Sequence, residues 1–106
     1  MFCIDNLYFN MVWSSLEFEW DENKNRVNLK KHKIDFSEAQ FVFADPFYKE
    51  FYDVKHSVSE DRWKVMGYVG KLLLSVIVTY RKDNVIRIIS ARDATPTERN
   101  EYYGNG

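Results

Sequence analysis

The pattern of apolar and polar residues changes near residue 47 of the chain. Before it, basic residues recur at helical spacings, whereas after it β-branched and aromatic residues gather in short runs between turn residues. Short runs of this kind are typical of strands. We expect these strands at residues 47–54, 62–69, 71–80 and 85–92. The alternating sequence Glu-Phe-Glu-Trp at residues 17–20 predicts one more short strand ahead of the helices.

Two helices are predicted between residues 21 and 46, each marked by a side chain that caps its start. Asp21 precedes the segment 22–32, whose basic residues form a broad cationic side; a solvent-exposed face is the simpler interpretation. Ser37 and Gln40 have the spacing of a capping box, so the second helix should begin at Ser37 and end before Pro46. The residues expected to pack inward from this helix are Phe41, Val42 and Phe43.

Short turns connect the predicted strands. Gly70-Lys71 and Lys82-Asp83-Asn84 are turn sequences, so consecutive strands should pair antiparallel. The uninterrupted apolar run from Leu72 to Val78 predicts a central strand covered on both faces. Thr95-Pro96-Thr97-Glu98 combines a capping box with proline at the first helical position and predicts a terminal helix. The predicted fold class is α+β, with an antiparallel sheet packed against two N-terminal helices and a short C-terminal helix.

The composition fits one soluble globular domain. Hydrophobic residues make up 45% of the chain, and Cys3 is the single cysteine, which excludes a disulfide framework. No apolar run after residue 20 approaches the roughly 20 residues of a membrane helix. The first 20 residues contain no Lys or Arg, unlike a signal peptide. We expect a protein of the reducing cytoplasm with no membrane segment.

Charge is segregated along the chain, although the net charge is only −1. Residues 62–92 hold seven basic residues and one acidic residue, whereas residues 35–61 hold two basic and seven acidic residues. The most basic block therefore coincides with the most strand-like sequence. This pattern suits a polyanion bound to one face of the sheet, and it equally suits a solvated sheet face.

Arginines are the first candidates for chemistry. Arg87 interrupts the apolar strand 85–92 and Arg92 closes it, although an unpaired guanidinium is costly to bury. In a regular strand the two side chains point to opposite faces. Either a β-bulge or a position of Arg92 just past the strand end would bring them to one site. Arg81 and Arg62 stand at the ends of neighbouring strands, and the simpler interpretation of each is a surface or sheet-edge charge.

The segment 53–62 concentrates the groups suited to proton transfer. His56 has an unperturbed pKa in the range of a general acid or base, and Glu60 serves equally if burial tunes it. A surface histidine is the simpler interpretation of His56, and His32 fits a cation at a helix C-terminus. The chain contains no nucleotide-binding or zinc-protease motif, and its two histidines with scattered carboxylates make no convincing metal set. We predict neither a cofactor nor a metal.

Four segments together resemble the BrnT toxins of bacterial type II toxin–antitoxin systems. They occur in order and with family-like spacing between residues 17 and 103. The segments are FEWDENKNRVNLKKH (residues 18–32), FSEAQFVFADP (36–46), HSVSEDR (56–62) and RIISARDAT (87–95). The resemblance makes residues 17–106 a single toxin domain and residues 1–16 an N-terminal extension. One departure is Lys33, which stands where family members commonly have the glycine that ends the first helix.

The resemblance implies a RelE-like fold and a metal-independent endoribonuclease that uses the RNA 2′-hydroxyl as its nucleophile. It also implies neutralisation by a BrnA-like antitoxin, a heterotetramer with that antitoxin, and operator DNA binding only through the complex. Carried onto this chain, the catalytic candidates are His56, Glu60, Arg62, Arg87 and Arg92, and the RNA-binding candidates are Lys24, His32 and Arg81. The alternative is a noncatalytic module that binds an antitoxin or nucleic acid through the same basic sheet.

Overall fold

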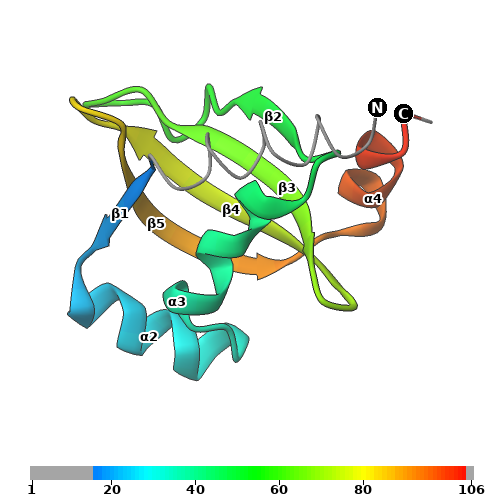
Figure 1. Cartoon of the computed structure of the whole chain (residues 1–106), viewed down its shortest axis with the longest axis horizontal. Coiled ribbons are helices and arrows are strands. Elements are labelled where there is room, and N and C mark those ends of the chain that lie inside the picture. The colour runs from blue at the N-terminus through cyan, green and yellow to red at the C-terminus, as the bar shows by residue number, and fades with distance from the viewer. Residues whose placement is uncertain (1–15, 105–106) are drawn as a thin grey trace, which may run out of the picture.

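The computed structural model describes residues 16–104 and shows the predicted order of strands and helices (Figure 1). The expected N-terminal extension, residues 1–16, lies outside the described residues except for Leu16. The elements are β1 (Glu17–Trp20), α2 (Glu22–His32), α3 (Phe36–Ala39), the 3₁₀ helix η1 (Gln40–Ala44), β2 (Lys49–Tyr52), β3 (Trp63–Val69), β4 (Leu72–Tyr80), β5 (Val85–Asp93) and α4 (Pro96–Tyr102).

The five strands form one sheet in the order β1-β5-β4-β3-β2. Strands β2 to β5 pair antiparallel, as their short turns predict, and β4 is the central strand. The prediction of a purely antiparallel sheet is wrong for β1, which pairs with β5 in parallel. Because no hairpin links β1 to β5, no local turn fixes their relative direction.

The predicted first helix is confirmed. The Asp21 side chain accepts hydrogen bonds from the backbone N–H groups of Asn23 and Lys24, at 2.8 and 3.3 Å, and the helix ends at His32. Lys33 follows with a φ of 63°, the left-handed conformation that glycine adopts most readily. The helix therefore ends in a conformation that favours glycine, and Lys33 adopts it at the cost of strain.

The prediction that the second helix begins with a capping box at Ser37 is wrong. Asp35 is the N-cap: its Oδ1 accepts the Ser37 N–H at 2.9 Å, and Asn25 of α2 holds the same oxygen at 3.1 Å. This tertiary contact favours the earlier cap. After Ala39 the chain tightens into η1, whose three residues per turn rotate Phe41 outward. Phe41 is 45% exposed, contrary to the prediction, whereas Val42 and Phe43 are buried as expected.

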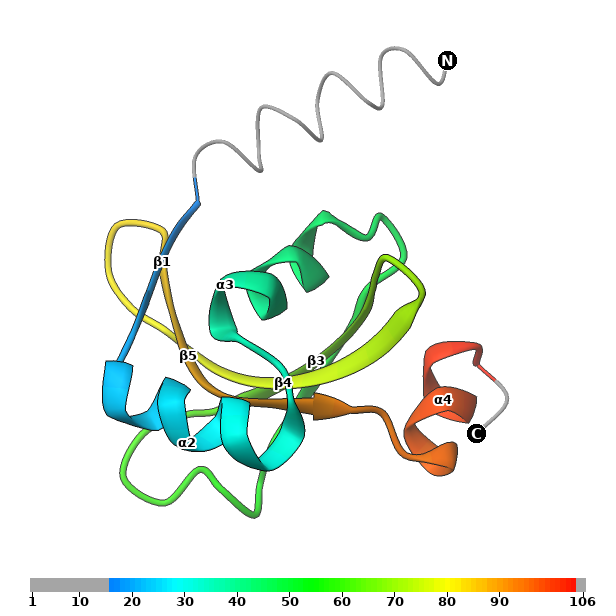
Figure 2. The same ribbon diagram turned by 90° about the horizontal axis from the view of Figure 1, so that it is seen from below.

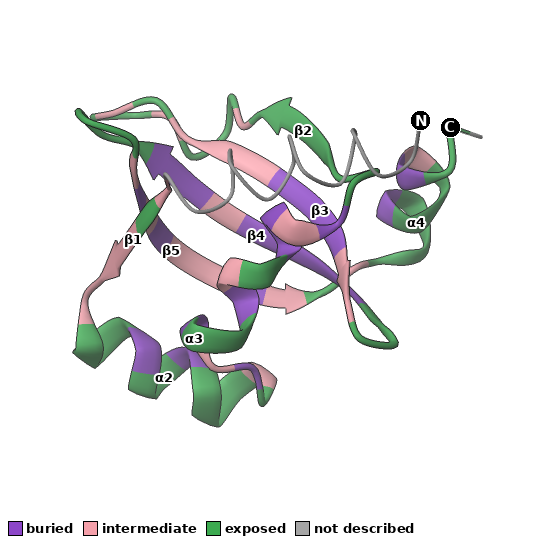
Figure 3. Cartoon of the chain, viewed as in Figure 1, coloured by how far each residue is buried: buried purple, intermediate pink, exposed green. Residues whose placement is uncertain are grey.

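Helix α3 and η1 cover one face of the curved sheet, and the segment 53–62 lies on the other side (Figure 2). The core between the two layers runs along the central strands β3, β4 and β5, where Figure 3 shows buried residues on each strand. Gly67 of β3 allows η1 to approach closely, since a Cβ atom there would lie 2.7 Å from the Val42 carbonyl oxygen. The largest fully buried side chains of the core include Phe36, Leu74, Ile88, Val42, Val65, Val76 and Val78.

The predicted start of the terminal helix is confirmed. The Thr95 hydroxyl accepts the Glu98 N–H at 3.1 Å, and the Glu98 carboxylate accepts the Thr95 N–H at 2.9 Å. Tyr102 anchors the other end of α4, with its hydroxyl donating to Asp45 at 2.6 Å, and burial raises the pKa of this phenol. No helix within residues 16–104 has the length and apolar character to cross a membrane.

Candidate active site

A β-bulge in β5 settles how Arg87 and Arg92 are oriented. Ile77 of β4 pairs with Ser90 and Val78 pairs with Ile88, so Ile89 is an extra residue in the strand. The extra residue reverses the alternation, and Arg87 and Arg92 both lie on the sheet face opposite α3. Asn28 of α2 supports this geometry, because its side-chain oxygen accepts the Ala91 N–H at 3.1 Å. The bulge alternative is therefore the one the structure adopts.

A groove of about 650 Å³ lies on this face, between the end of α2, the segment 53–62 and α4. We call it the basic groove. Four of the predicted site residues line it: His32, His56, Arg62 and Arg92. Its further lining includes Lys31, Phe51, Tyr52, Asp53, Lys55, Lys64, Glu98 and Glu101. Cationic and aromatic side chains thus surround one concave surface, a combination suited to a single-stranded polyanion with bases.

Arg92 is held by a buried carboxylate beneath the groove. Its Nη1 and Nη2 donate to the two oxygens of Glu98 at 2.7 and 2.9 Å, and Nη1 also donates to the Asp93 carbonyl at 3.1 Å. Burial raises the pKa of Glu98, but the hydrogen bonds from Arg92, Thr95 and Lys64 outweigh it and lower the pKa to about 2. The same contact with Glu98 raises the pKa of Arg92. Both groups are therefore charged at neutral pH.

Arg62 enters the groove from the start of β3. Its Nη2 donates to Glu60 at 3.3 Å, while its Nε is buried and has no hydrogen-bond partner among residues 16–104. The backbone around it is fixed, because the Arg62 N–H donates to the Ser57 hydroxyl at 2.8 Å and the Arg62 carbonyl accepts the Asp53 N–H at 2.9 Å. A buried donor without an acceptor is rare in folded proteins, so the pairing of the Arg62 guanidinium within the chain is incomplete.

His56 is oriented by Asp53 on the same loop. Its Nδ1 lies 2.8 Å from the Asp53 Oδ2, and the backbone N–H of His56 donates to the other oxygen of that carboxylate at 3.3 Å. The imidazole is half exposed, whereas Asp53 is 14% exposed. A carboxylate that accepts the Nδ1 proton leaves Nε2 as the nitrogen that exchanges protons.

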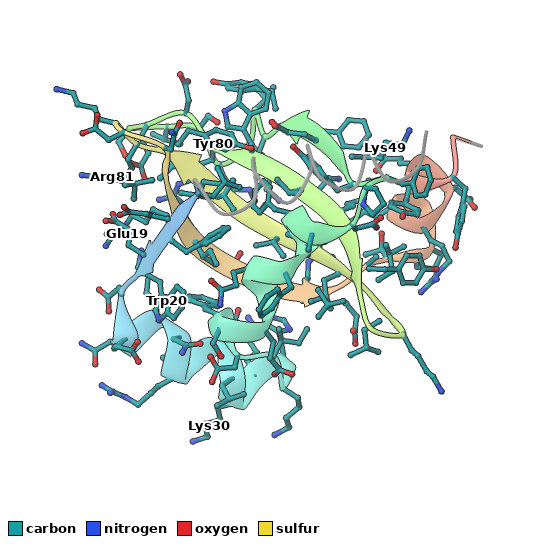
Figure 4. All side chains as sticks on the ribbon, viewed as in Figure 1. Glu19, Trp20, Lys30, Lys49, Tyr80 and Arg81 are labelled. Carbon is teal, nitrogen blue, oxygen red and sulfur yellow. The ribbon has the colours of Figure 1, made fainter. Side chains whose placement is uncertain are left out.

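Four predicted residues lie outside the basic groove. Glu19 of β1 pairs with both Arg87, at 2.9 Å, and Arg81, at 3.3 Å; Figure 4 shows Glu19 and Arg81 close together at this edge of the sheet. Glu60 and Arg81 line a neighbouring cavity of about 780 Å³. Lys24 lines a third hollow, of about 370 Å³, which shares His32 with the basic groove. Of the three arginines predicted to share one site, Arg62 and Arg92 line the basic groove and Arg87 does not.

Known proteins match this chain in sequence and in fold. A family model described as the ribonuclease toxin BrnT of type II toxin–antitoxin systems matches residues 20–98. The chain belongs to the BrnT family. The crystal structure of the BrnT ribonuclease toxin from Brucella abortus matches this BrnT chain with a TM-score of 0.59 and 25% sequence identity, over 76% of this chain and 97% of that chain. No curated protein matches the chain.

Membership confirms the resemblance seen in the sequence and sets the class of activity. The protein is a BrnT-type ribonuclease toxin of a type II toxin–antitoxin system, and such a toxin has a protein antitoxin as its partner. The matched residues 20–98 include strands β2 to β5 and the last residue of β1, and they extend to Glu98. All residues that line the basic groove except Glu101 therefore lie within the BrnT region.

Several residues of this BrnT groove escaped the sequence analysis. Glu98 was visible only as a capping residue, because its contact with Arg92 depends on how α4 packs. Lys64 alternates with apolar residues in β3 and gave no signal beyond a sheet-face charge. Asp53 stands three residues before His56, a spacing that would have identified it as the partner of that histidine. Among residues 16–104 no group of three or more His, Cys, Asp or Glu side chains is placed to hold a metal.

Proposed function

We propose that this BrnT toxin is a metal-independent endoribonuclease with a RelE-like fold and mechanism, acting on RNA in the basic groove. The observation that carries the proposal is the shared groove of Arg62, Arg92 and the Asp53-oriented His56. In the proposed reaction the RNA 2′-hydroxyl attacks the adjacent phosphorus. The bond from phosphorus to the 5′-oxygen breaks, leaving a 2′,3′-cyclic phosphate and a free 5′-hydroxyl. No water or metal is consumed in this step.

The two arginines supply charge stabilisation. Attack by the 2′-oxygen builds negative charge on the non-bridging phosphate oxygens, and preorganised guanidiniums in a concave site relieve that charge. Arg92 has an edge, formed by Nε and Nη2, that no group of the described chain occupies fully. Arg62, whose side chain is 24% exposed and lines the same groove, is the second guanidinium. Together they provide donors for one phosphodiester.

Proton transfer completes the proposal. His56 accepts the 2′-hydroxyl proton through Nε2, and a protonated group must donate to the departing 5′-oxygen. Glu60 remains a proton-transfer candidate, although its carboxylate pairs with Arg62 at 3.3 Å and lines the neighbouring cavity. For Arg87, Arg81 and Lys24, which lie outside the basic groove, and for His32, which lines it, we propose contacts with flanking phosphates.

The partner proposed for this surface is a BrnA-like antitoxin. An antitoxin that covers the basic groove would exclude RNA, and the complex would be a heterotetramer that binds operator DNA through the antitoxin. We also propose that the toxin acts in the cytoplasm, where its RNA substrate and antitoxin are made. Charge complementarity supports the proposal that an antitoxin covers the groove, since a basic concave surface favours an acidic or anionic occupant.

The decisive experiment is cleavage of a labelled RNA by the purified toxin in excess chelator. Wild type is expected to produce 2′,3′-cyclic phosphate ends, and Arg92→Ala or His56→Ala to slow single-turnover cleavage by about 10²-fold or more. The matched control is Lys71→Gln on the β3–β4 turn, which removes a cation far from the groove and should cleave normally. Activity that disappears with chelator and returns with a divalent ion would refute metal independence.

One observation favours the noncatalytic alternative. Arg62, Arg87 and Arg92 each form an ion pair within the chain, with Glu60, Glu19 and Glu98 respectively, as purely structural arginines would. Expression in cells separates the two possibilities. A nuclease arrests growth and degrades RNA, and the neighbouring antitoxin gene restores growth, whereas a binding module leaves cellular RNA intact.

A further inference from the structure

A carboxylate beneath an anion-binding groove is electrostatically unfavourable for the substrate. Glu98 is such a group: its side chain is 7% exposed and lines the basic groove, directly below the positions where RNA phosphates are proposed to bind. Burying a charge also costs free energy unless it is fully paired. Its presence there therefore calls for a function that outweighs both effects.

The contacts of Glu98 divide between two purposes. Oε1 accepts the Thr95 backbone N–H at 2.9 Å, which closes the capping box of α4, and it also accepts from Arg92 Nη1 at 2.7 Å. Oε2 accepts from Arg92 Nη2 at 2.9 Å and Ser75 Oγ at 3.3 Å, and lies 3.2 Å from Lys64 Nζ. A capping box needs only one acceptor oxygen at this position, and glutamine serves as well as glutamate. The second oxygen and the negative charge are left for Arg92 and Lys64.

The pairing with Glu98 also selects which side of the Arg92 guanidinium is available. A guanidinium has two edges able to bind an anion in a bidentate manner: one formed by Nη1 and Nη2, the other by Nε and Nη2. Glu98 occupies the first edge with both oxygens. The second edge keeps the Nε proton and one Nη2 proton, for which residues 16–104 provide no acceptor.

We infer that Glu98 is a positioning residue that fixes the Arg92 guanidinium so that its Nε–Nη2 edge receives the scissile phosphate. The inference rests on the proposed ribonuclease function and deepens it. Glu98 touches no substrate atom in this arrangement. Its charge neutralises part of the groove, and in exchange it removes the rotational freedom of Arg92 before RNA binds.

The test variant is Glu98→Gln, which keeps the acceptor for Thr95 but cannot pair with both Nη groups of Arg92. We expect the rate constant of single-turnover cleavage to fall about 10- to 100-fold, because a small misplacement of a charge-stabilising group slows the reaction by this much. Affinity for a non-cleavable 2′-deoxy oligonucleotide should stay equal or become tighter, since one negative charge has left the groove. Opposite changes in turnover and binding would not arise from a merely structural role, which lowers both with the folded fraction.

Two further measurements complete the design. Glu38→Gln on α3, on the opposite face of the sheet, removes the same formal charge and should change neither turnover nor binding. Arg92→Lys should lower kcat by itself, and the double variant with Glu98→Gln should be no slower than Arg92→Lys, because the two residues act through one guanidinium. Multiplicative losses would overturn the inference.

The failures are distinguishable. If wild type does not cleave RNA, the proposed function falls and the inference falls with it. If wild type cleaves and folded Glu98→Gln retains full kcat, only the inference falls. Should Glu98→Gln not fold, NMR of the wild-type Arg92 side chain gives the answer: the 2′-deoxy oligonucleotide should shift the Nε–H resonance, and an unmoved resonance would overturn the inference.

Discussion

The carboxylate of Glu98 shows how a single side chain links the terminal helix to the groove. Its ion pairs with Arg92 and Lys64 require the ionised carboxylate. Its hydrogen bond from the Thr95 N–H requires only an acceptor oxygen. Removing the charge leaves Arg92 without its bidentate partner, although that guanidinium is 39% exposed and can be solvated. The stability of the fold and the geometry of the groove therefore depend on the same proton equilibrium.

Acid titration should reveal this coupling. The pKa of Glu98 is lowered from 4.5 to about 2 on folding. A group with a depressed pKa stabilises the fold fully above its unfolded pKa and loses that contribution as the pH falls through the folded pKa. The contribution is roughly 3 kcal/mol as an upper value, present above about pH 4.5 and lost towards pH 2.

Urea unfolding of wild type and Glu98→Gln across this range isolates the effect, because the other carboxylates are common to both proteins. Wild type should be more stable at pH 7, and the difference in unfolding free energy should shrink as the pH drops from 4.5 to 2. A difference independent of pH would show that the ion pair with Arg92 contributes nothing to folding.

At the scale of the elements, locally coded features could be predicted from the sequence. The caps at Asp21 and Thr95 involve residues two or three positions apart, so helix α2 and helix α4 begin where the sequence places them. The turn at Asp83-Asn84 likewise adopts two consecutive positive φ angles, which Asp and Asn tolerate better than most residues. Such features depend on nothing outside their own segment.

Features that depend on tertiary contacts could not be predicted. The N-cap of α3 moved from Ser37 to Asp35 because Asn25 binds Asp35 from another helix. The bulge at Ile89 brings Arg92 to the groove face, and Asn28, 63 residues earlier, satisfies the Ala91 N–H next to it. Sequence parity alone left two alternatives for Arg92, because nothing local in strand β5 specifies the extra residue.

The strained end of α2 yields a stability prediction. Lys33 has a φ of 63°, a conformation that costs a side-chain-bearing residue roughly 1 kcal/mol relative to glycine. Lys33→Gly should therefore raise the free energy of unfolding by about 0.5–1 kcal/mol, after the greater flexibility of glycine in the unfolded chain is subtracted. Thermal unfolding should show a higher midpoint.

The control belongs to the same helix. Lys30 lies in the helical part of α2 and extends away from the sheet in Figure 4, so Lys30→Gly should destabilise the protein by about 1 kcal/mol. Equal destabilisation by both substitutions would show that the left-handed position carries no strain that glycine relieves.

At the scale of the whole molecule, folding concentrates charge that the composition hides. The net charge is −1, yet one face gathers cations from α2, the segment 53–62, β3 and β5. Acidic residues on the same face are engaged: Asp53 with His56, Glu98 with Arg92, and Glu101 with Lys64. The groove therefore concentrates cations that the net charge does not reveal, and an antitoxin that covers this face would block the proposed RNA site.

The salt dependence of RNA binding measures this concentration of charge directly. The groove cations are Lys31, Lys55, Arg62, Lys64 and Arg92. If three to four of them neutralise phosphates, the slope of log affinity against log salt should be about −2 to −3 for single-stranded RNA, and raising salt from about 50 to 200 mM should weaken binding roughly 20- to 60-fold. Lys55→Gln should reduce the slope by about 0.7, whereas Lys71→Gln, on the distant β3–β4 turn, should leave it unchanged. Equal reductions by the two variants would mean that RNA binds through the general field of the protein, and the basic groove would then lose its claim to be the RNA site.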